Sequence, residues 1–192
     1  LAVSPFLSTA VIAATALRHV SDARAEAALA KIASGDATYA LAVDETSKFN
    51  PDATAMTATA EGNGFRLTGK KTFVVDGTLA DRLLVLAKTD NGLTLFDIPA
   101  DRAGITRNAQ NMIDARDSAR IDFDNVEATG DDVLGQVDDA MTVLKPAIKA
   151  GQAALAAEMA GVAAGAFGMT VGYLKERKQF GTLIGTFQAL QH

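Results

Sequence analysis

The sequence predicts an α+β protein in which short N-terminal helices precede an antiparallel β-barrel or sandwich and a long C-terminal helix. Apolar residues recur at helical spacing near both ends of the chain, whereas polar and apolar residues alternate between residues 38 and 126. Turn residues separate the short apolar runs of this middle stretch, which is typical of antiparallel sheets. The expected domain boundaries are residues 1–35, 36–134 and 135–192.

The N-terminal zone is predicted to form two helices. Ser4 and Pro5 suit a helix start, because proline is tolerated in the first turn. Ser21 or Asp22 would cap the second helix, and Gly35 would end it. The chain begins without a basic segment and an apolar run, so we interpret this start as internal rather than as a signal peptide.

The middle zone is predicted to contain strands and two hairpins. Gly62 and Gly64 supply turn chemistry for the first hairpin, and Asn91 with Gly92 suits the turn of the second. The expected strands are residues 39–43, 54–60 with 65–67, 72–75, 82–87 with 93–98, and 119–124.

The C-terminal zone returns to helical spacing from about residue 136. Pro146 lies near the start of this pattern, which then runs unbroken to Lys178 or breaks near Gly168. Five glycines lie within it, and each costs a helix about 1 kcal/mol relative to alanine, so small residues indicate close helix packing. A membrane span is disfavoured, because Glu158 would add a penalty of about 2.5 kcal/mol or more in lipid.

Composition excludes several classes of function. The chain has 192 residues and a net charge of -5, which gives no basic face for nucleic acid. It has no cysteine, which excludes disulfides and thiolate chemistry and is compatible with the cytoplasm. His19 and His192 lie far apart and lack metal-ligand spacing, and the acidic residues near Asp117 and Asp122 fit an exposed strand face, so no metal site is predicted.

Residues 173–181 (YLKERKQFG) followed by residues 187–191 (FQALQ) form the most informative motif. This motif resembles the C-terminal-domain signature of the acyl-CoA dehydrogenases, flavoenzymes that desaturate acyl-CoA thioesters. The order of helices, β-domain and long helix is also similar to that family. The resemblance implies that the N-terminal helices end a helical domain and that the C-terminal helix begins a four-helix bundle.

The resemblance also implies roles for the motif residues. Arg177 would reach the pyrophosphate of an FAD across a subunit interface, and Gln179, Phe180 and Gln188 would hold the adenosine end. A guanidinium can bind phosphate oxygens bidentately, which suits the first role. In the alternative interpretation, Arg177 and its neighbouring lysines only complement the dipole of an exposed helix end.

The flavin-facing end is less similar to the family. Residues 42–46 (AVDET) match a strand end that is usually Ala-x-Thr-Glu-Pro, so the resemblance places Leu41, Val43 and Asp44 at the flavin. Asp44 replaces a threonine that donates a hydrogen bond to the flavin ring, and an ionised carboxylate can only accept one. Residues 47–51 (SKFNP) stand in place of a glycine-rich loop.

Residues 71–77 (KTFVVDG) match a second flavin strand that is usually Lys-x-Trp-Ile-Thr-Asn-Gly. Phe73 would therefore stack on or shield the flavin, while Val75 lacks the hydroxyl of the usual threonine. Each lost polar contact would weaken FAD binding by about 0.5–1.5 kcal/mol. Alternatively, Phe73 is a core aromatic of a buried strand.

The sequence shows no catalytic base for desaturation, which needs a carboxylate to remove the α-proton. In the family this glutamate lies either beyond the position of His192 or at the position of Gly151, which has no side chain. Gln152 also replaces a common arginine. Glu158 lies two turns further along the helix, where a structural carboxylate is expected.

Three functions follow. The first is a segment or short form of an FAD-dependent acyl-CoA dehydrogenase that acts on acyl-CoA as a homodimer or homotetramer. The second is a non-catalytic subunit that completes the flavin site of a related partner in a heteromeric assembly. The third is a β-domain binding module without flavin, which leaves the C-terminal motif unexplained.

Overall fold

The computed structural model describes residues 4–114 and 116–192. The first three residues, which enter our interpretation of the chain's start, lie outside the described part. The chain forms two compact units, residues 1–151 and residues 152–192. The order of helices, sheet and long helix confirms the predicted α+β class.

The N-terminal zone is helical as predicted. Its elements are the π-helix η1 (Phe6–Ala13), α1 (Ala14–Arg18) and α2 (Ala23–Ser34). Asp22 caps α2, because its Oδ1 accepts a hydrogen bond from the backbone N–H of Ala25 at 2.7 Å. Gly35 ends α2 in the left-handed conformation that glycine adopts readily, with φ of 81°.

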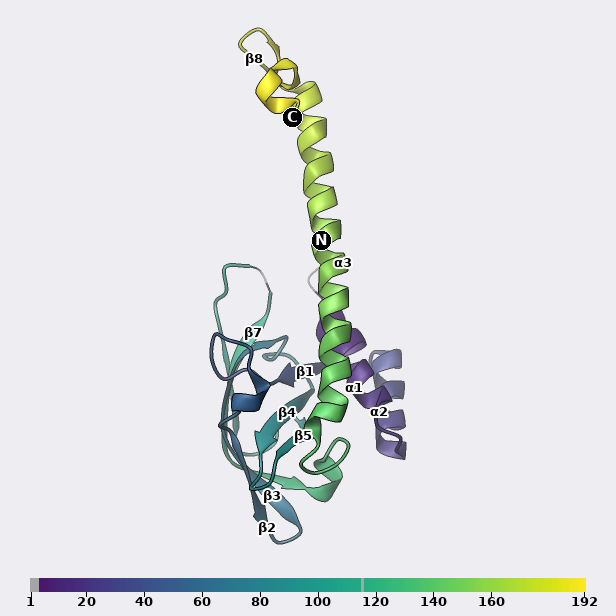
Figure 1. Ribbon diagram of the computed structural model, residues 1–192, viewed down its shortest axis with the longest axis vertical. Helices are drawn as coiled ribbons and strands as arrows, with labels where there is room; N and C mark the ends of the chain where they lie inside the picture. The colour runs from purple at the N-terminus through teal and green to yellow at the C-terminus, as the bar shows by residue number, and fades with distance from the viewer. Residues whose placement is uncertain (1–3, 115) are drawn as a thin grey trace. The chain divides into compact units, whose positions relative to one another are not determined.

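The middle zone forms one curled seven-stranded sheet (Figure 1). The strand order is β1-β4-β2-β3-β7-β6, with β5 paired to β4; β4 runs parallel to both β1 and β2, whereas the other pairs are antiparallel. The strands are β1 (Tyr39–Ala42), β2 (Thr57–Glu61), β3 (Gly64–Val75), β4 (Arg82–Lys88), β5 (Leu93–Pro99), β6 (Ile105–Ala109) and β7 (Ser118–Thr129).

The two predicted hairpins are confirmed as β2–β3 and β4–β5. Residues 65–67 and 72–75, predicted as separate strands, belong to the single strand β3. The register of β3 against β7 shifts between Leu67 and Gly69 and again between Lys71 and Val74, which interrupts the alternation that marks a strand. β6 escaped prediction, because its sequence ITRNA carries few apolar residues.

Two hydrophobic cores lie on opposite faces of the sheet. Successive side chains of a strand point to opposite faces, and β4 shows this: Leu83 and Val85 join the core inside the curl, while Leu84 and Leu86 join the core under the helices. The inner core includes an edge-to-face pair of Phe65 and Phe96, whose ring centroids are 5.4 Å apart.

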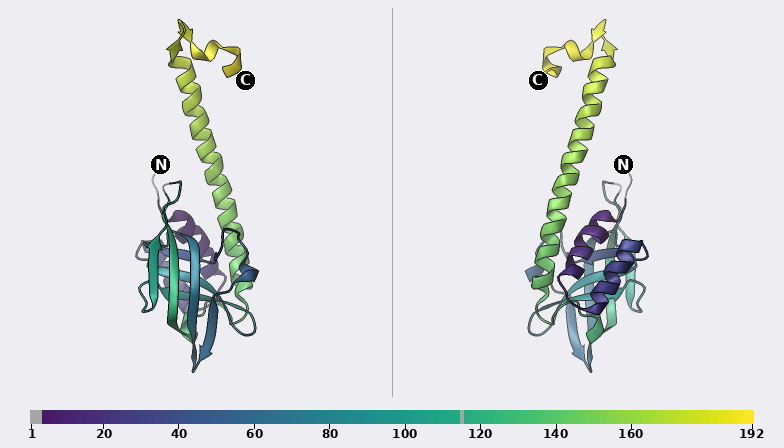
Figure 2. Two further views of the ribbon diagram at one scale, coloured as in Figure 1. Left: turned by 90° about the vertical axis from the view of Figure 1, so that its left-hand side faces the viewer. Right: turned by 90° about the vertical axis from the view of Figure 1, so that its right-hand side faces the viewer.

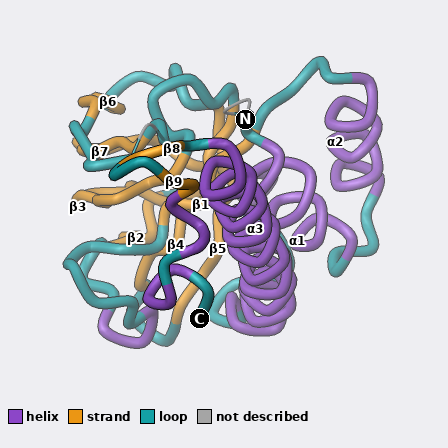
Figure 3. The backbone as a smooth tube through the Cα atoms, turned by 90° about the horizontal axis from the view of Figure 1, so that it is seen from above, coloured by secondary structure: helices purple, strands orange, loops and turns teal. Residues whose placement is uncertain are grey.

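The helices α1 and α2 lie on one side of the sheet in perpendicular views (Figures 2 and 3). The start of α3 (Ala140–Glu176) joins the same core through Val143, Leu144 and Ala147. This packing fixes the helical part of the first unit against β1, β4 and β5.

Helix α3 runs without a break over 37 residues, so the alternative of a break near Gly168 is wrong. Its remainder, with residues 177–192, forms the second unit. A short hairpin of β8 (Lys178–Gln179) and β9 (Thr182–Leu183) follows the helix, and then the 3-10 turns η4 (Ile184–Thr186) and η5 (Gln188–Leu190). By length and composition α3 could cross a membrane, a test that the core helix of a soluble protein also passes.

Candidate functional site

The end of β1 meets the bulged part of β3. The backbone N–H of Thr72 donates a hydrogen bond to the carbonyl oxygen of Asp44 at 2.7 Å. The Nζ of Lys71 donates to the carbonyl oxygen of Val43 at 3.1 Å. The structure therefore brings Val43 and Asp44 next to Phe73, although these predicted residues lie about thirty positions apart in the sequence.

A buried ion pair supports this junction. The Lys71 side chain is fully buried, and its Nζ lies 2.7 Å from Oε1 of Glu45. The Glu45 carboxylate also accepts hydrogen bonds from the backbone N–H groups of Ala55 at 2.8 Å and Met56 at 3.0 Å. Burial opposes ionisation of Glu45, but these hydrogen bonds, with that from Lys71 first among them, lower its pKa overall. Burial lowers the pKa of Lys71, and Glu45 counteracts that effect.

Asp44 presents an unused acceptor at the same place. Its Oδ1 is inaccessible to solvent and has no hydrogen-bond partner among the described residues. Burial raises the pKa of Asp44, and the nearby charge of Lys71 counteracts part of that rise. A buried polar atom without a partner is unusual in a folded protein and marks a place where a donor is missing.

The predicted flavin-facing residues divide into two groups. Phe73 and Val75 are each 38% exposed and flank the buried Val74. In contrast, Val43 is buried in the core under the helices, and Leu41 packs against that core. The side chains of Phe73 and Val75 are therefore available to a ligand, whereas those of Leu41 and Val43 support the strand.

A polar network that the sequence did not reveal holds the turn after β3. The Ser8 hydroxyl donates to Oδ2 of Asp76 at 2.5 Å, and Asp76 has a positive φ of 58°. Asp117 accepts hydrogen bonds from the backbone N–H of Thr78 at 2.9 Å and from its hydroxyl. The prediction that Asp117 belongs to an exposed strand face is therefore wrong, because it precedes β7 and binds this turn.

The second unit contains the residues that were predicted to hold the adenosine end of the cofactor, namely Gln179, Phe180 and Gln188. Phe180 and Gly181 have φ values of 53° and 79°, which suits a two-residue hairpin turn between β8 and β9. Phe180 is 92% exposed and meets Phe187 edge to face, with ring centroids 6.2 Å apart. Gln179 lies in β8, and Gln188 follows Phe187 directly.

Arg177 lies between the end of α3 and this hairpin. Its backbone N–H donates to the carbonyl oxygen of Tyr173, and its carbonyl oxygen accepts from the N–H of Ile184, both at 2.9 Å. The guanidinium is exposed and makes no ion pair within the part of the chain that the structure describes. The backbone of Arg177 is therefore held in place by hydrogen bonds, while its guanidinium is exposed and could bind an anion.

Position 151, where the resemblance would place a catalytic glutamate, is closely packed in this chain. Gly151 is buried, and a Cβ added there would lie 2.9 Å from Cγ1 of Ile12. The Ile12 side chain of η1 therefore occupies the space in which a larger residue at this position would begin. A side chain at position 151 would therefore require Ile12 to shift.

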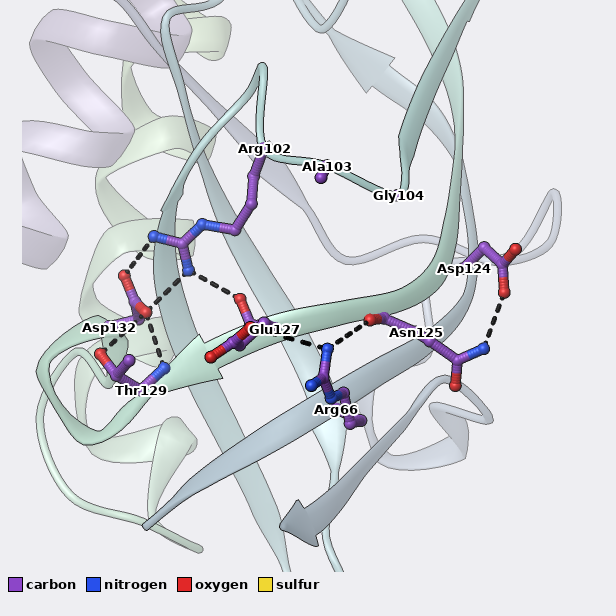
Figure 4. A pocket seen from close by; sticks show the side chains of 9 residues that line it. All are labelled: Arg66, Arg102, Ala103, Gly104, Asp124, Asn125, Glu127, Thr129 and Asp132. Carbon is purple, nitrogen blue, oxygen red and sulfur yellow. Dashed lines mark hydrogen bonds and ion pairs between the residues drawn. The ribbon is translucent and has the colours of Figure 1, made fainter. Parts of the chain in front are cut away.

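A separate pocket of about 480 Å³ lies near the other end of β3 (Figure 4). Arg102 binds Asp132 bidentately at 2.7 and 2.9 Å, and Arg66 pairs with Glu61 and Glu127. Carboxylates already form ion pairs with both arginines, so the pocket does not resemble an anion site.

Among residues 4–114 and 116–192, no group of three acidic or histidine side chains could hold a metal ion.

Comparison with known proteins identifies the family. Residues 40–126 match the family model of the acyl-CoA dehydrogenase middle domain, and residues 140–192 match that of the acyl-CoA dehydrogenase C-terminal domain. The chain belongs to the acyl-CoA dehydrogenase family. Within it, the β1–β3 junction lies in the middle-domain match, and Arg177 lies in the C-terminal match.

Individual relatives and solved structures that resemble this chain agree with its assignment to the acyl-CoA dehydrogenase family. A 3-(aryl)acrylate reductase of Clostridium sporogenes is 31% identical over 181 residues, which cover 89% of this chain and 48% of the relative. A solved structure of the Tcur3481-Tcur3483 steroid ACAD is 34% identical with a TM-score of 0.84, and covers 98% of this chain and 50% of that one.

Butyryl-CoA dehydrogenase from Megasphaera elsdenii has a TM-score of 0.91 at 23% identity over 97% of this chain and 52% of that one, which shows the shared fold. The chain spans less than half the length of the curated relatives that it matches, between 33% and 49%.

Proposed function

We propose that this chain is part of an FAD-dependent acyl-CoA dehydrogenase that desaturates the α,β bond of acyl-CoA thioesters. The observation that carries the proposal is the hydrogen bond between Asp44 and Thr72, which joins the end of β1 to β3. Beside this junction, the side chains of Phe73 and Val75 are partly exposed. This junction joins the two strands that resemble the flavin-facing strands of the family.

The residues of this junction fit the ring system of a flavin. A flavin ring offers a flat apolar surface and an N–H donor on its pyrimidine edge. Phe73 and Val75 offer exposed apolar surface. Oδ1 of Asp44 is an acceptor that the described residues leave unused, and because it is inaccessible to solvent a bound flavin would reach it only after the side chain turns outward. FAD bound here would supply the acceptor for the hydride that the thioester loses.

The second unit supports an assembly of subunits. Arg177 offers a guanidinium suited to a pyrophosphate, and Phe180 offers an exposed aromatic ring. We propose that these residues contact the FAD of a partner in a homodimer, homotetramer or heteromeric assembly. The exposed apolar side chains of α3 would then pack in a helical bundle; they are Leu155, Met159, Val162, Phe167, Met169 and Tyr173.

The α-proton needs a base that Gly151 cannot supply. Since Ile12 fills the adjacent space, the proposed base comes from another segment of the protein or from a partner subunit. The role of this chain is then to orient and shield the flavin rather than to move the proton.

Flavin absorption of the purified protein tests the proposal. We expect a visible flavin band in the assembled protein, and Arg177→Ala should lose FAD during gel filtration. Lys149→Ala is the matched control, because Lys149 is an exposed cation that lies in α3, outside the C-terminal motif. A protein that stays colourless with FAD and with every related subunit would contradict the proposal.

Asp44 specifically favours a second function, that of a non-catalytic subunit. An ionised carboxylate cannot replace the hydrogen bond that a threonine donates, and Gly151 lacks a carboxylate altogether. A protein that becomes yellow only after mixing with a second related polypeptide would support this function. A protein that binds FAD and oxidises acyl-CoA alone would exclude it.

A further inference from the structure

Strand β3 contains an unusual backbone conformation at Phe73. Thr72 and Phe73 lie in the register shift between Lys71 and Val74 and have no partner in the ladder with β7. Phe73 has a φ of 53°, which bulky residues seldom adopt. Such a conformation is strained and persists only where the surroundings hold it, often at functional positions. Other residues must therefore fix the backbone of Phe73.

One side chain binds both residues of this bulge. The backbone N–H of Phe73 donates to Oε1 of Gln110 at 2.8 Å, and Nε2 of Gln110 donates to Oγ1 of Thr72 at 3.1 Å. Gln110 is itself fixed, because its backbone N–H donates to the carbonyl oxygen of Ser118 at 2.7 Å. The amide of Gln110 thus takes the place of the missing strand partner for Phe73.

The bulge is held from the opposite side by β1. The N–H of Thr72 donates to the carbonyl oxygen of Asp44, so the Thr72–Phe73 pair lies between the end of β1 and the loop after β6. As a result, the Phe73 side chain points toward solvent and is 38% exposed, whereas the next residue, Val74, is buried in the inner core. A bulge that served packing alone would not need to expose an aromatic side chain.

We propose that Gln110 is a positioning residue for the flavin-facing surface. It sets the direction of the Phe73 ring through the backbone and so sets how closely an aromatic plane approaches a flavin at the β1–β3 junction. This inference rests on the proposed function for its ligand, but the fixing of Phe73 by Gln110 can be measured without any flavin.

Amide exchange tests the fixing directly. In this chain without flavin, the Phe73 amide proton should exchange slowly, and Gln110→Met should remove its protection while preserving the volume of the side chain. Gln110→Glu should retain protection, because the carboxylate still offers an acceptor. Gln136→Met is the matched control at an exposed glutamine and should leave Phe73 unchanged. Equal protection of Phe73 in the wild type and in Gln110→Met would overturn the proposal.

A fluorescent reporter then connects the fixing to the ligand. The chain has no tryptophan, so Phe73→Trp introduces a single indole at the bulge. Gln110→Met in this background should lower the fluorescence anisotropy of the indole and shift its emission, whereas Gln110→Glu should restore both. Far-UV circular dichroism of each variant identifies any that has lost its fold, and the Gln110→Glu variant keeps the test valid in that case.

Titration with FAD separates the two possible failures. Quenching of the indole by FAD that weakens with Gln110→Met supports the complete proposal. If FAD leaves the indole of Phe73→Trp unquenched while Gln110→Met still changes its anisotropy, the flavin assignment fails and the positioning of residue 73 stands. If Gln110→Met changes neither anisotropy nor quenching, the positioning role is wrong even where FAD binds.

Discussion

Lys71 and Glu45 form an ion pair of 2.7 Å beneath the junction of β1 and β3, and the lysine side chain is fully buried. Glu45 in turn accepts two backbone N–H groups from residues that precede β2. One carboxylate therefore links β3, the end of β1 and the approach to β2. The pair fixes the segment that presents Asp44 and Phe73.

Replacement of Lys71 should destabilise the protein strongly. Lys71→Met would leave the partly buried Glu45 carboxylate without its cation, and breaking such a pair costs about 3–5 kcal/mol. The free energy of unfolding, measured by urea denaturation, should fall by that amount. The double variant Lys71→Met/Glu45→Gln should lose less, because no unpaired charge remains. An unchanged urea midpoint in Lys71→Met would show that the pair does not support the fold.

Asp44→Asn should change the pH dependence of stability. Burial raises the pKa of Asp44 above its ordinary 3.8, so the folded state holds this proton more tightly than the unfolded state does. The stability that Asp44 contributes is therefore present below its unfolded pKa and is lost as pH rises through the folded pKa.

Thermal unfolding over a pH series checks this sign. Relative to wild type, Asp44→Asn should raise Tm at neutral pH and have little effect in acid, where Asp44 is protonated in both states. Asp52→Asn, at an exposed aspartate of the connection between β1 and β2, is the control. A Tm difference between Asp44→Asn and wild type that does not depend on pH would disprove the argument.

Val75→Thr should strengthen FAD binding if the proposed function holds. The change restores a hydroxyl at a half-exposed position of the flavin-facing strand, and one such hydrogen bond contributes about 0.5–1.5 kcal/mol. The Kd for FAD should therefore fall by about two- to tenfold in a fluorescence titration. Val137→Thr makes the same chemical change at an exposed valine in the connector before α3 and should leave Kd unchanged. An equal effect of both variants would refute a specific contact at Val75.

The two arginines of the pocket in Figure 4 should differ in their effect on stability. Arg102 binds Asp132, which is only 8% exposed, so Arg102→Met should lower the free energy of unfolding by about 1.5–3 kcal/mol. Arg66 pairs with Glu61 at the surface, where water screens the attraction between the charges, so Arg66→Met should change the free energy of unfolding much less. Urea denaturation of Arg102→Met and Arg66→Met compares them under the same conditions, and losses of equal size would contradict this ranking.

The sequence predicted the fold where local rules decide structure. The capping of α2 by Asp22 and Gly35 follows from local hydrogen bonds, and the β2–β3 hairpin follows from its glycine turn. The apolar run of residues 82–87 and the turn at Asn91 and Gly92 likewise predicted the β4–β5 hairpin. These features depend on neighbours within a few residues along the chain.

The residues of the β1–β3 junction could not be predicted in the same way from local sequence patterns. The resemblance placed Asp44 and Phe73 at the flavin, but the hydrogen bond that joins their strands connects segments outside any ladder. The sequence pattern predicted no role for Gln110 and placed Asp117 on an exposed strand face, whereas both lie in the loop between β6 and β7. Their partners, Phe73 and Thr78, come from a distant strand and turn, and a single sequence does not reveal such pairs.

The double-sided burial of β4 makes the first unit cooperative. Leu83 and Leu84 are both fully buried, yet they belong to different cores, so a fluctuation that withdraws this strand exposes both to water at once. We therefore expect the N-terminal helices and the curled sheet to share one unfolding transition. Loosening of α1 or α2 would be transmitted through the strand to the face that carries Phe73.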